Sequence, residues 1–150
     1  MREEGVNKLE VHVTGICMHE GKVLTGKRAP TRRLYPNLWD CSGGQVRLGE
    51  NFEEAVKRQF IEEFGAIVTP IIPSGTYQIR TPELPQKKIP DIKFVCKLES
   101  FINGKEPQLS EEHTERRWQE LDKLDEIEFI PGIIEDIKTA DRLLTELKIH

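Results

Sequence analysis

Two adjacent glutamates, Glu62 and Glu63, lie in the segment from 44 to 66, GQVRLGENFEEAVKRQFIEEFGA. Arg58 precedes Glu62 by four residues, and Glu50 lies near the start of the segment. Carboxylate oxygens are the ligands that Mg²⁺ prefers. A bound Mg²⁺ neutralises phosphate oxygens and lowers the pKa of its water, which hydrolysis of a diphosphate bond requires. The segment therefore indicates metal-dependent chemistry on a diphosphate.

A helix is predicted to position these carboxylates. Asn51 is a suitable N-cap, and Glu54 completes the spacing of a capping box. Gly65 stands where a left-handed residue ends a helix. Apolar residues recur every four positions and form one stripe for the core: Phe52, Val56, Phe60 and Phe64. The adjoining edge of the helix carries the polar residues Arg58, Gln59, Glu62 and Glu63.

Spacing also suggests how the polar groups support one another. Arg58 and Glu62 are four residues apart, so an ion pair can hold the Glu62 carboxylate in one rotamer. Glu50 can reach the same metal cluster or fix Arg58. The main-chain carbonyl of Gly44 is a further candidate ligand, since glycine lets the backbone approach an ion closely.

The register of Gly44, Glu50, Arg58, Glu62, Glu63 and Gly65 resembles the Nudix box, Gx5Ex7REUxEExGU, of MutT-like hydrolases. The resemblance implies an α+β fold, an α/β/α sandwich in which a mixed β-sheet is flanked by helices. It also implies a Mg²⁺-dependent pyrophosphohydrolase, with Mn²⁺ as a substitute, that cleaves a nucleoside diphosphate linked to another group. Metal ligands implied by the resemblance are Gly44, Glu50, Glu62, Glu63 and the residue at position 59.

Position 59 departs from the family pattern, because the box has glutamate where this chain has Gln59. In the family that glutamate binds metal and commonly orients or deprotonates the attacking water. Glutamine keeps one carbonyl oxygen but accepts no proton, and loss of a general base costs about 10²–10⁴-fold in rate. Two explanations are open: Gln59 was introduced to trap a substrate, or the natural protein lacks the glutamate and uses another base or only binds nucleotide.

An acidic loop from Ser110 to Glu115 offers another acid. In many relatives a late loop of this character carries an acid that moves onto the metals, and Glu112 is the first choice here, with Glu115 second. The alternative is an exposed acidic turn.

Arg28 lies in a KRAP stretch ahead of the box. It resembles an arginine that contacts substrate phosphate in oxidised-nucleotide diphosphatases, and a guanidinium suits that contact. A plain surface arginine is the alternative. Arg32 and Arg33 could shield phosphates from the neighbouring loop.

The substrate class stays open between several alternatives. A nucleoside triphosphate, cleaved to the monophosphate and pyrophosphate, is favoured by the short chain; ADP-ribose or another ADP-sugar is suggested by Pro82. A silent nucleotide-binding or sensor module is suggested by Gln59. An isopentenyl-diphosphate isomerase has the same fold, but no second motif supports isomerisation.

The remaining sequence predicts one domain, residues 1–150, with helices and strands mixed along the chain. An amphipathic helix is expected after Pro131. Loops are expected at 29–37 and at the proline-rich 81–90. Strands are expected at 9–18, 23–28, 38–46, 67–72, 76–80, 92–99 and 117–121.

Composition limits the partners and the cellular location that we expect. The net charge of −4 argues against a nucleic-acid polymer as partner. No apolar run reaches the length of a membrane span, and the first residues do not resemble a signal peptide. Three cysteines without CxxC spacing indicate buried, reduced thiols, which fits a cytoplasmic protein. Trp39 and Trp118 are expected to pack in the core or at its rim.

Overall fold

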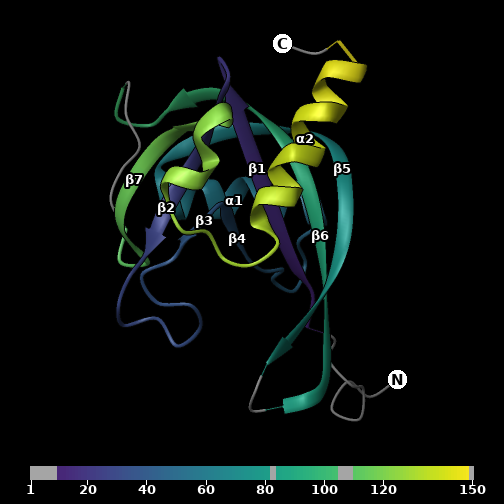
Figure 1. The fold of residues 1–150 in the computed structure, drawn as a ribbon. Helices are drawn as coiled ribbons and strands as arrows, with labels where there is room; N and C mark the ends of the chain where they lie inside the picture. The colour runs from purple at the N-terminus through teal and green to yellow at the C-terminus, as the bar shows by residue number, and fades with distance from the viewer. Residues whose placement is uncertain (1–9, 82–83, 105–109, 149–150) are drawn as a thin grey trace.

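The computed structural model describes residues 10–81, 84–104 and 110–148. Seven strands form one mixed sheet, and a helix covers each of its faces (Figure 1). This is the α/β/α arrangement expected from the sequence. The elements are β1 (His12–His19), β2 (Lys22–Arg28), β3 (Trp39–Asp40), β4 (Ser42–Gln45), α1 (Phe52–Phe64), β5 (Ala66–Thr81), β6 (Leu84–Phe101), β7 (His113–Glu120), the 3₁₀ helix η1 (Leu121–Glu126) and α2 (Ile133–Glu146).

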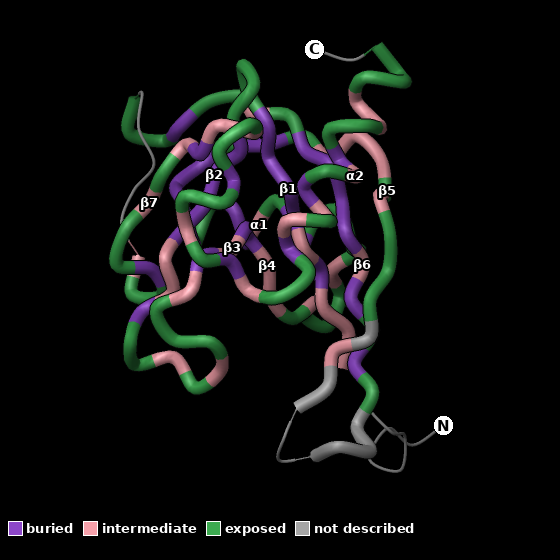
Figure 2. The backbone as a smooth tube through the Cα atoms, in the orientation of Figure 1, coloured by how far each residue is buried: buried purple, intermediate pink, exposed green. Residues whose placement is uncertain are grey.

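Strand β1 organises the sheet. Along one side it pairs in parallel with β6, from His12 opposite Asp91 to Met18 opposite Lys97. Its other side is divided, because β2 pairs with its C-terminal end and β4 with its N-terminal half. Figure 2 shows β1 and the middle of β6 as largely buried segments. The strand that opens the box, β4, is therefore attached directly to the centre of the fold.

Helix α1 begins and ends as the sequence predicts. The Asn51 side chain accepts a hydrogen bond from the Glu54 N–H at 2.8 Å, and the Glu54 side chain accepts one from the Asn51 N–H. At the other end, Gly65 adopts a left-handed conformation with φ 61°. The helix lies very close to β1, since a Cβ added to Gly15 would come within 2.3 Å of the Phe60 ring. Glycine at position 15 therefore sets the distance between helix and sheet.

The predicted division of α1 into an apolar stripe and a polar edge is wrong in part. Phe52 is exposed, because it opens the helix ahead of the turns that pack on the sheet. The buried face instead includes two polar residues, Gln59 and Glu63, among apolar ones: Ala55, Val56, Gln59, Phe60, Glu63 and Phe64. Two of the candidate site residues thus point into the protein and not along an open edge.

Helix α2 covers the opposite face of the sheet, as Figure 1 shows. It buries Ile133, Ile137 and Ala140 against a second cluster that includes Ile16 and Val95. Proline at 131 and a Gly132 N-cap with φ 94° precede it, so the predicted C-terminal helix is confirmed.

The proline-rich segment predicted as a loop at 81–90 is wrong where the structure describes it, because residues 84–90 belong to β6. Similarly, 67–72 and 76–80 are parts of one long strand, β5. β5 is the edge of the sheet, and its pairing shifts at Pro70 and Pro73, where prolines are tolerated. Among the described residues, β1 pairs with β6 from Asp91 onward.

Other predictions for the core are confirmed. Cys17, Cys41 and Cys96 are buried free thiols. Trp39 is buried, and Trp118 packs partly buried against the α1 side of the core. Among the described residues, no helix is long and apolar enough to cross a membrane.

Candidate functional site

Glu63 is a buried acid held under the box loop. Its side chain is packed beneath β4, where Oε1 accepts a hydrogen bond from Ser42 Oγ at 2.7 Å and from the Gly43 N–H at 3.0 Å. Burial raises the pKa of Glu63 well above its usual value, and a hydrogen bond with Glu112 raises it further. Among the described residues, the largest causes of this shift include no cationic side chain.

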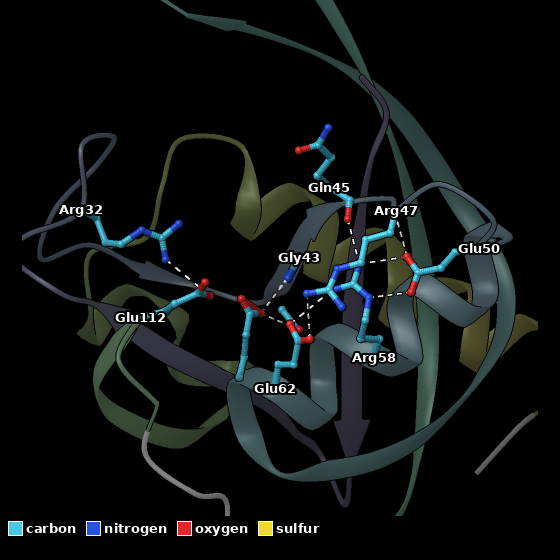
Figure 3. A network of polar contacts seen from close by, with 10 residues as sticks. Arg32, Gly43, Gln45, Arg47, Glu50, Arg58, Glu62 and Glu112 are labelled. Carbon is cyan, nitrogen blue, oxygen red and sulfur yellow. Dashed lines mark hydrogen bonds and ion pairs between the residues drawn. The ribbon is translucent and has the colours of Figure 1, made fainter. Parts of the chain in front are cut away.

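Glu112 is the partner of Glu63 and lies just before β7. The hydrogen bond from Glu63 lowers the pKa of Glu112, and the nearby Arg32 contributes. Arg32 Nη1 lies 3.5 Å from Glu112 Oε2, and Figure 3 shows the two side chains facing each other. The contact between the two acids therefore moves their pKa values in opposite directions, upward for Glu63 and downward for Glu112. Glu115, the second choice, instead pairs with Lys27 at 3.6 Å.

Arg58 is the centre of a separate ionic network at the start of the helix (Figure 3). Its Nη2 donates to Glu50 Oε1 and to the Gln45 carbonyl, both at 2.9 Å. Its Nη1 lies 3.2 Å from Glu62 Oε2, which is the ion pair that the spacing predicts. Arg47 adds a second cation to Glu62 at 3.1 Å. Glu50 therefore fixes Arg58, the second of its two predicted roles.

Gln59 lies against the glycine that opens the box. A Cβ added to Gly44 would come within 2.3 Å of Gln59 Nε2 and 3.0 Å of its Oε1. The side chain is only 8% exposed, one helical turn before Glu63. The amide of Gln59 and the carboxyl of Glu63 thus sit side by side beneath Gly43 and Gly44.

These oxygens fit a divalent cation in chemistry and in charge. A buried acid whose pKa is raised is a place where a cation can replace the proton. Within the described residues, no three Asp, Glu, His or Cys side chains gather closely enough to hold a metal. The box pattern would supply a third carboxylate at position 59, where this chain has Gln59. Donors that could hold a cation are therefore Glu63, Glu112, the Gln59 carbonyl oxygen and the main-chain carbonyl of Gly44, with Glu62 joining if it leaves its arginines.

A pocket of about 310 Å³ opens beside this group. Gly43 and Gly44 line it together with Arg28 and Arg32. Arg28 is itself held in place, because Nε donates to the Leu34 carbonyl at 3.0 Å and Nη1 lies 3.2 Å from Asp40. Arg33 is exposed and does not line the pocket. Two of the three arginines singled out in the sequence thus face a space next to the acids.

The same pocket contains a charged cluster that sequence reasoning missed. Lys93 Nζ lies 3.2 Å from Asp91 Oδ2 and 2.8 Å from Asp136 Oδ2. Thr14 Oγ1 donates to both oxygens of Asp91, and Lys93 Nζ lies 5.3 Å from the centre of the Tyr77 ring. Burial opposes the charge on Lys93, but the two aspartates outweigh it and raise the lysine pKa. The sequence did contain a signal for this cluster, because Asp91 and Lys93 are charged residues in a strand that is otherwise rich in apolar ones.

His113 lies next to Glu112 and stays neutral. Burial lowers the pKa of His113 to about 4, and the nearby Arg116 adds to the effect. Its ring packs on Phe64 with 5.1 Å between ring centres. The histidine therefore supplies no positive charge to the acid pair at neutral pH.

The family model for the NUDIX domain matches residues 7–139. The chain belongs to the Nudix family. This confirms the resemblance that rests on the box, and it makes the chain a member of a family of pyrophosphohydrolases.

Several known proteins are similar to this Nudix chain. The nucleoside triphosphatase NudI of an Escherichia coli O139:H28 strain is 29% identical over 110 residues, covering 71% of this chain and 78% of NudI. The MutT protein of Methanosarcina mazei Go1 is 27% identical with a TM-score of 0.73, covering 90% and 94% of the two chains. The NUDIX domain of NrtR from Shewanella oneidensis, solved with ADP ribose, has a TM-score of 0.73 at 14% identity, covering 96% and 94%. That last likeness shows the fold alone.

Within this Nudix chain, the predicted site residues fall into two groups. Gln59, Glu63 and Glu112 gather below Gly44, and Arg28 faces the adjoining pocket. Glu50, Arg58 and Glu62 form the ionic network beside them. Helix α1 carries members of both groups, Gln59 and Glu63 in the first and Arg58 and Glu62 in the second.

Proposed function

We propose that this chain is a divalent-cation-dependent pyrophosphohydrolase acting on a nucleoside diphosphate linked to another group. A nucleoside triphosphate, cleaved to the monophosphate and pyrophosphate, is the substrate favoured here. The observation that carries the proposal is the buried Glu63 carboxyl, which accepts hydrogen bonds from Ser42 and the Gly43 N–H and contacts Glu112. Because the pocket beside it presents Arg28 and Arg32, a phosphate chain has cationic partners at that end.

Each residue has a defined task in this proposal. A bound Mg²⁺ or Mn²⁺ supplies charge neutralisation and a water of lowered pKa. Glu63, Glu112 and the Gly44 carbonyl would hold the cation, and the Arg58 network fixes the loop that carries Gly44 through the Gln45 carbonyl. Arg28 and Arg32 would bind phosphate oxygens. Glu112, whose pKa is lowered, is the acid that would accept a proton from water, because the Gln59 amide cannot.

Support for a nucleoside triphosphate comes from the NudI relative, which is named for that activity. The pocket volume of about 310 Å³ lies at the lower end of small-molecule sites, which suits one nucleoside better than an ADP-sugar. ADP-ribose stays the alternative substrate. Pro82, which suggested it, lies outside the described residues.

The decisive experiment restores the missing carboxylate. Gln59→Glu is expected to raise the rate of nucleotide cleavage with Mg²⁺ by at least about 10²-fold, because it supplies the base and a third acid ligand. The measurement is pyrophosphate and phosphate release from a panel of nucleoside triphosphates and ADP-ribose.

Gln45→Glu is the matched control. It makes the same chemical change one residue from Gly44, but the side chain is exposed and points away from the acids (Figure 3). The control is expected to leave the rate unchanged. Ordinary enzyme rates in the parent chain, with no gain from Gln59→Glu, would show that residue 59 does not have the role given to it here.

A nucleotide-binding or sensor module is the second candidate, favoured by Gln59 itself. Such a protein binds nucleotide but gains no turnover in Gln59→Glu. Calorimetric binding of a triphosphate by both proteins, with no product from either, would favour this candidate over the enzyme.

A further inference from the structure

The cluster of Asp91, Lys93 and Asp136 has a charge balance that folding alone does not explain. Lys93 is buried in the sheet and contacts two carboxylates. Removing three charges from water is costly, and a buried ion cluster is often no more stabilising than apolar side chains of the same volume. A charged cluster in this place therefore points to recognition of a ligand.

Strand geometry places the cluster within reach of a nucleoside whose phosphates lie at the box. Gly43 pairs with Thr14 across β4 and β1, and Thr14 pairs with Lys93 across β1 and β6. Two strand spacings separate Gly43 from Lys93, which is roughly 10 Å. A ribose and a base can bridge that span, and both ends line the same pocket.

Strands β5 and β6 and helix α2 bring the cluster together on the α2 side of the sheet. Asp91 and Lys93 are two residues apart on β6, so they share a face. Tyr77 on β5 pairs with Asp91, and its ring lies beside the Lys93 ammonium. Asp136 comes from the first turn of α2, where the helix dipole favours an acid. The aromatic ring and the charges thus border one end of the pocket.

The hydrogen-bonding capacity of the cluster is unequal. Two carboxylates offer four oxygens with about eight acceptor positions. The side-chain donors that contact them are the Thr14 hydroxyl and the Lys93 ammonium, which together bring about four protons. The excess of acceptors, with a net charge of −1, favours a ligand edge that carries several N–H donors.

We infer that Asp91, Lys93 and Asp136 form the subsite that reads the nucleobase and that they select bases with an exocyclic amino group over uracil and thymine. The inference rests on the proposed function, because it requires a nucleotide with its phosphates at the box. Adenine, guanine and cytosine each present an amino group with two N–H donors, whereas uracil and thymine present a single ring N–H.

Matched nucleotides test the inference on the parent chain without any substitution. CTP and UTP differ at position 4 of the base, and ATP and ITP differ at position 6, amino against oxo in each case. Calorimetry in the presence of Mn²⁺ is expected to show CTP bound about tenfold more tightly than UTP, and ATP more tightly than ITP, which corresponds to one charge-assisted hydrogen bond. Equal affinities within both pairs would overturn the inference.

Asp136→Asn tests the residues. It removes one carboxylate at a partly exposed position where Asn is tolerated, and it is expected to bring the CTP-to-UTP affinity ratio close to one. Glu135→Gln is the matched control, since it removes the same charge from the adjacent, exposed residue of the same helix turn. The control is expected to keep the parent ratio.

The remaining outcomes separate this inference from the proposed function. If neither the parent nor Gln59→Glu binds or cleaves any triphosphate, the proposed function fails and the inference fails with it. If triphosphates are bound or cleaved without regard to the base, only the subsite is wrong. If Asp136→Asn changes the ratio of CTP to dCTP and leaves CTP against UTP unchanged, the cluster reads the sugar and the inference is overturned.

Discussion

Glu62 and Glu63 are consecutive residues on α1, but the fold gives them opposite surroundings. Glu62 is partly exposed and lies within 3.2 Å of Arg58 and Arg47. Glu63 is 4% exposed and contacts a hydroxyl, an N–H and a second acid. Glu62 is paired with two arginines, whereas the contacts of Glu63 among the described residues are with a hydroxyl, an N–H and an acid.

The difference shows which acid is prepared for an incoming ion. A compensated carboxylate gains little from another cation, whereas a buried carboxyl that keeps its proton can ionise when a divalent ion replaces that proton. The Arg58 network therefore holds the box loop in place, and the Glu63–Glu112 pair is the group that gains most from binding a cation. Neighbouring helix positions are 100° apart, so Glu63 faces β4 while Glu62 faces the arginines.

The strongest test substitutes the two glutamates separately. In the active Gln59→Glu background, Glu63→Gln is expected to lower kcat by about 10³-fold, because loss of a metal ligand removes several kcal/mol of charge stabilisation. Glu62→Gln is expected to cost clearly less. Initial rates with saturating Mg²⁺ measure both. Equal losses would remove the distinction drawn between the two acids.

His113 tests whether the histidine beside Glu112 adds a positive charge to the acid pair. Its pKa in the folded protein, about 4, lies below the ordinary value of about 6.5. The unfolded chain therefore takes up the proton first as pH falls. The contribution of His113 to the free energy of unfolding is fully present above pH 6.5 and is lost toward pH 4, by up to about 3 kcal/mol.

Urea unfolding across this pH range measures the decline. His113→Phe keeps a ring against Phe64 but cannot titrate, and it is expected to flatten the pH dependence. His19→Gln, at an exposed position, is the control and is expected to leave it unchanged. An NMR titration midpoint of His113 near or above pH 6.5 would show that the folded protein does not keep this histidine neutral, which would contradict its assignment here.

Metal affinity is expected to depend on pH through the proton that Glu63 holds. The pKa of Glu63 is raised, so a cation must displace the proton, and affinity for Mn²⁺ is expected to rise by as much as about tenfold per pH unit until that pKa is passed. Calorimetry at several pH values gives the slope. The same ions are expected to raise the melting temperature of the parent, and Glu63→Gln is expected to abolish that rise. A melting temperature indifferent to metal in the parent would remove the metal from this site.

The smallest expected effect is on stability and concerns the ionic network of Arg58. Arg58→Gln is expected to lower the free energy of unfolding by about 1–2 kcal/mol, because it breaks partly buried bonds to Glu50 and to the Gln45 carbonyl. Arg47→Gln, which removes an exposed ion pair, is expected to cost less than about 0.5 kcal/mol. Similar costs for both would mean that the network does not frame the loop.

The box could be predicted because its information is local. A cap at Asn51, a stop at Gly65 and the four-residue step from Arg58 to Glu62 all depend on helix geometry, which spacing encodes directly. Burial of Gln59 and Glu63 could not be predicted in the same way. It depends on where β4 crosses the helix, which only the pairing of β4 with β1 determines.

The grouping of the charged cluster could not be predicted from the sequence for a related reason. Thr14, Lys93 and Asp136 are brought together by a parallel strand pair and by the docking of α2, and no sequence spacing connects them. The proline-rich segment was misjudged because local turn preference yielded to strand pairing at a sheet edge. Local rules located the chemistry of the box, whereas the substrate pocket required long-range contacts.

Close seating of α1 on the sheet has a mechanical consequence. Phe60 occupies the space left by the missing side chain of Gly15, and Gln59 occupies the corresponding space at Gly44. Helix α1 therefore cannot slide or rotate on the sheet unless both side chains withdraw. The position of Glu63, one turn after Gln59, is fixed in this way, so adjustment to different ligands must come from the loops and strands on the far side of the pocket.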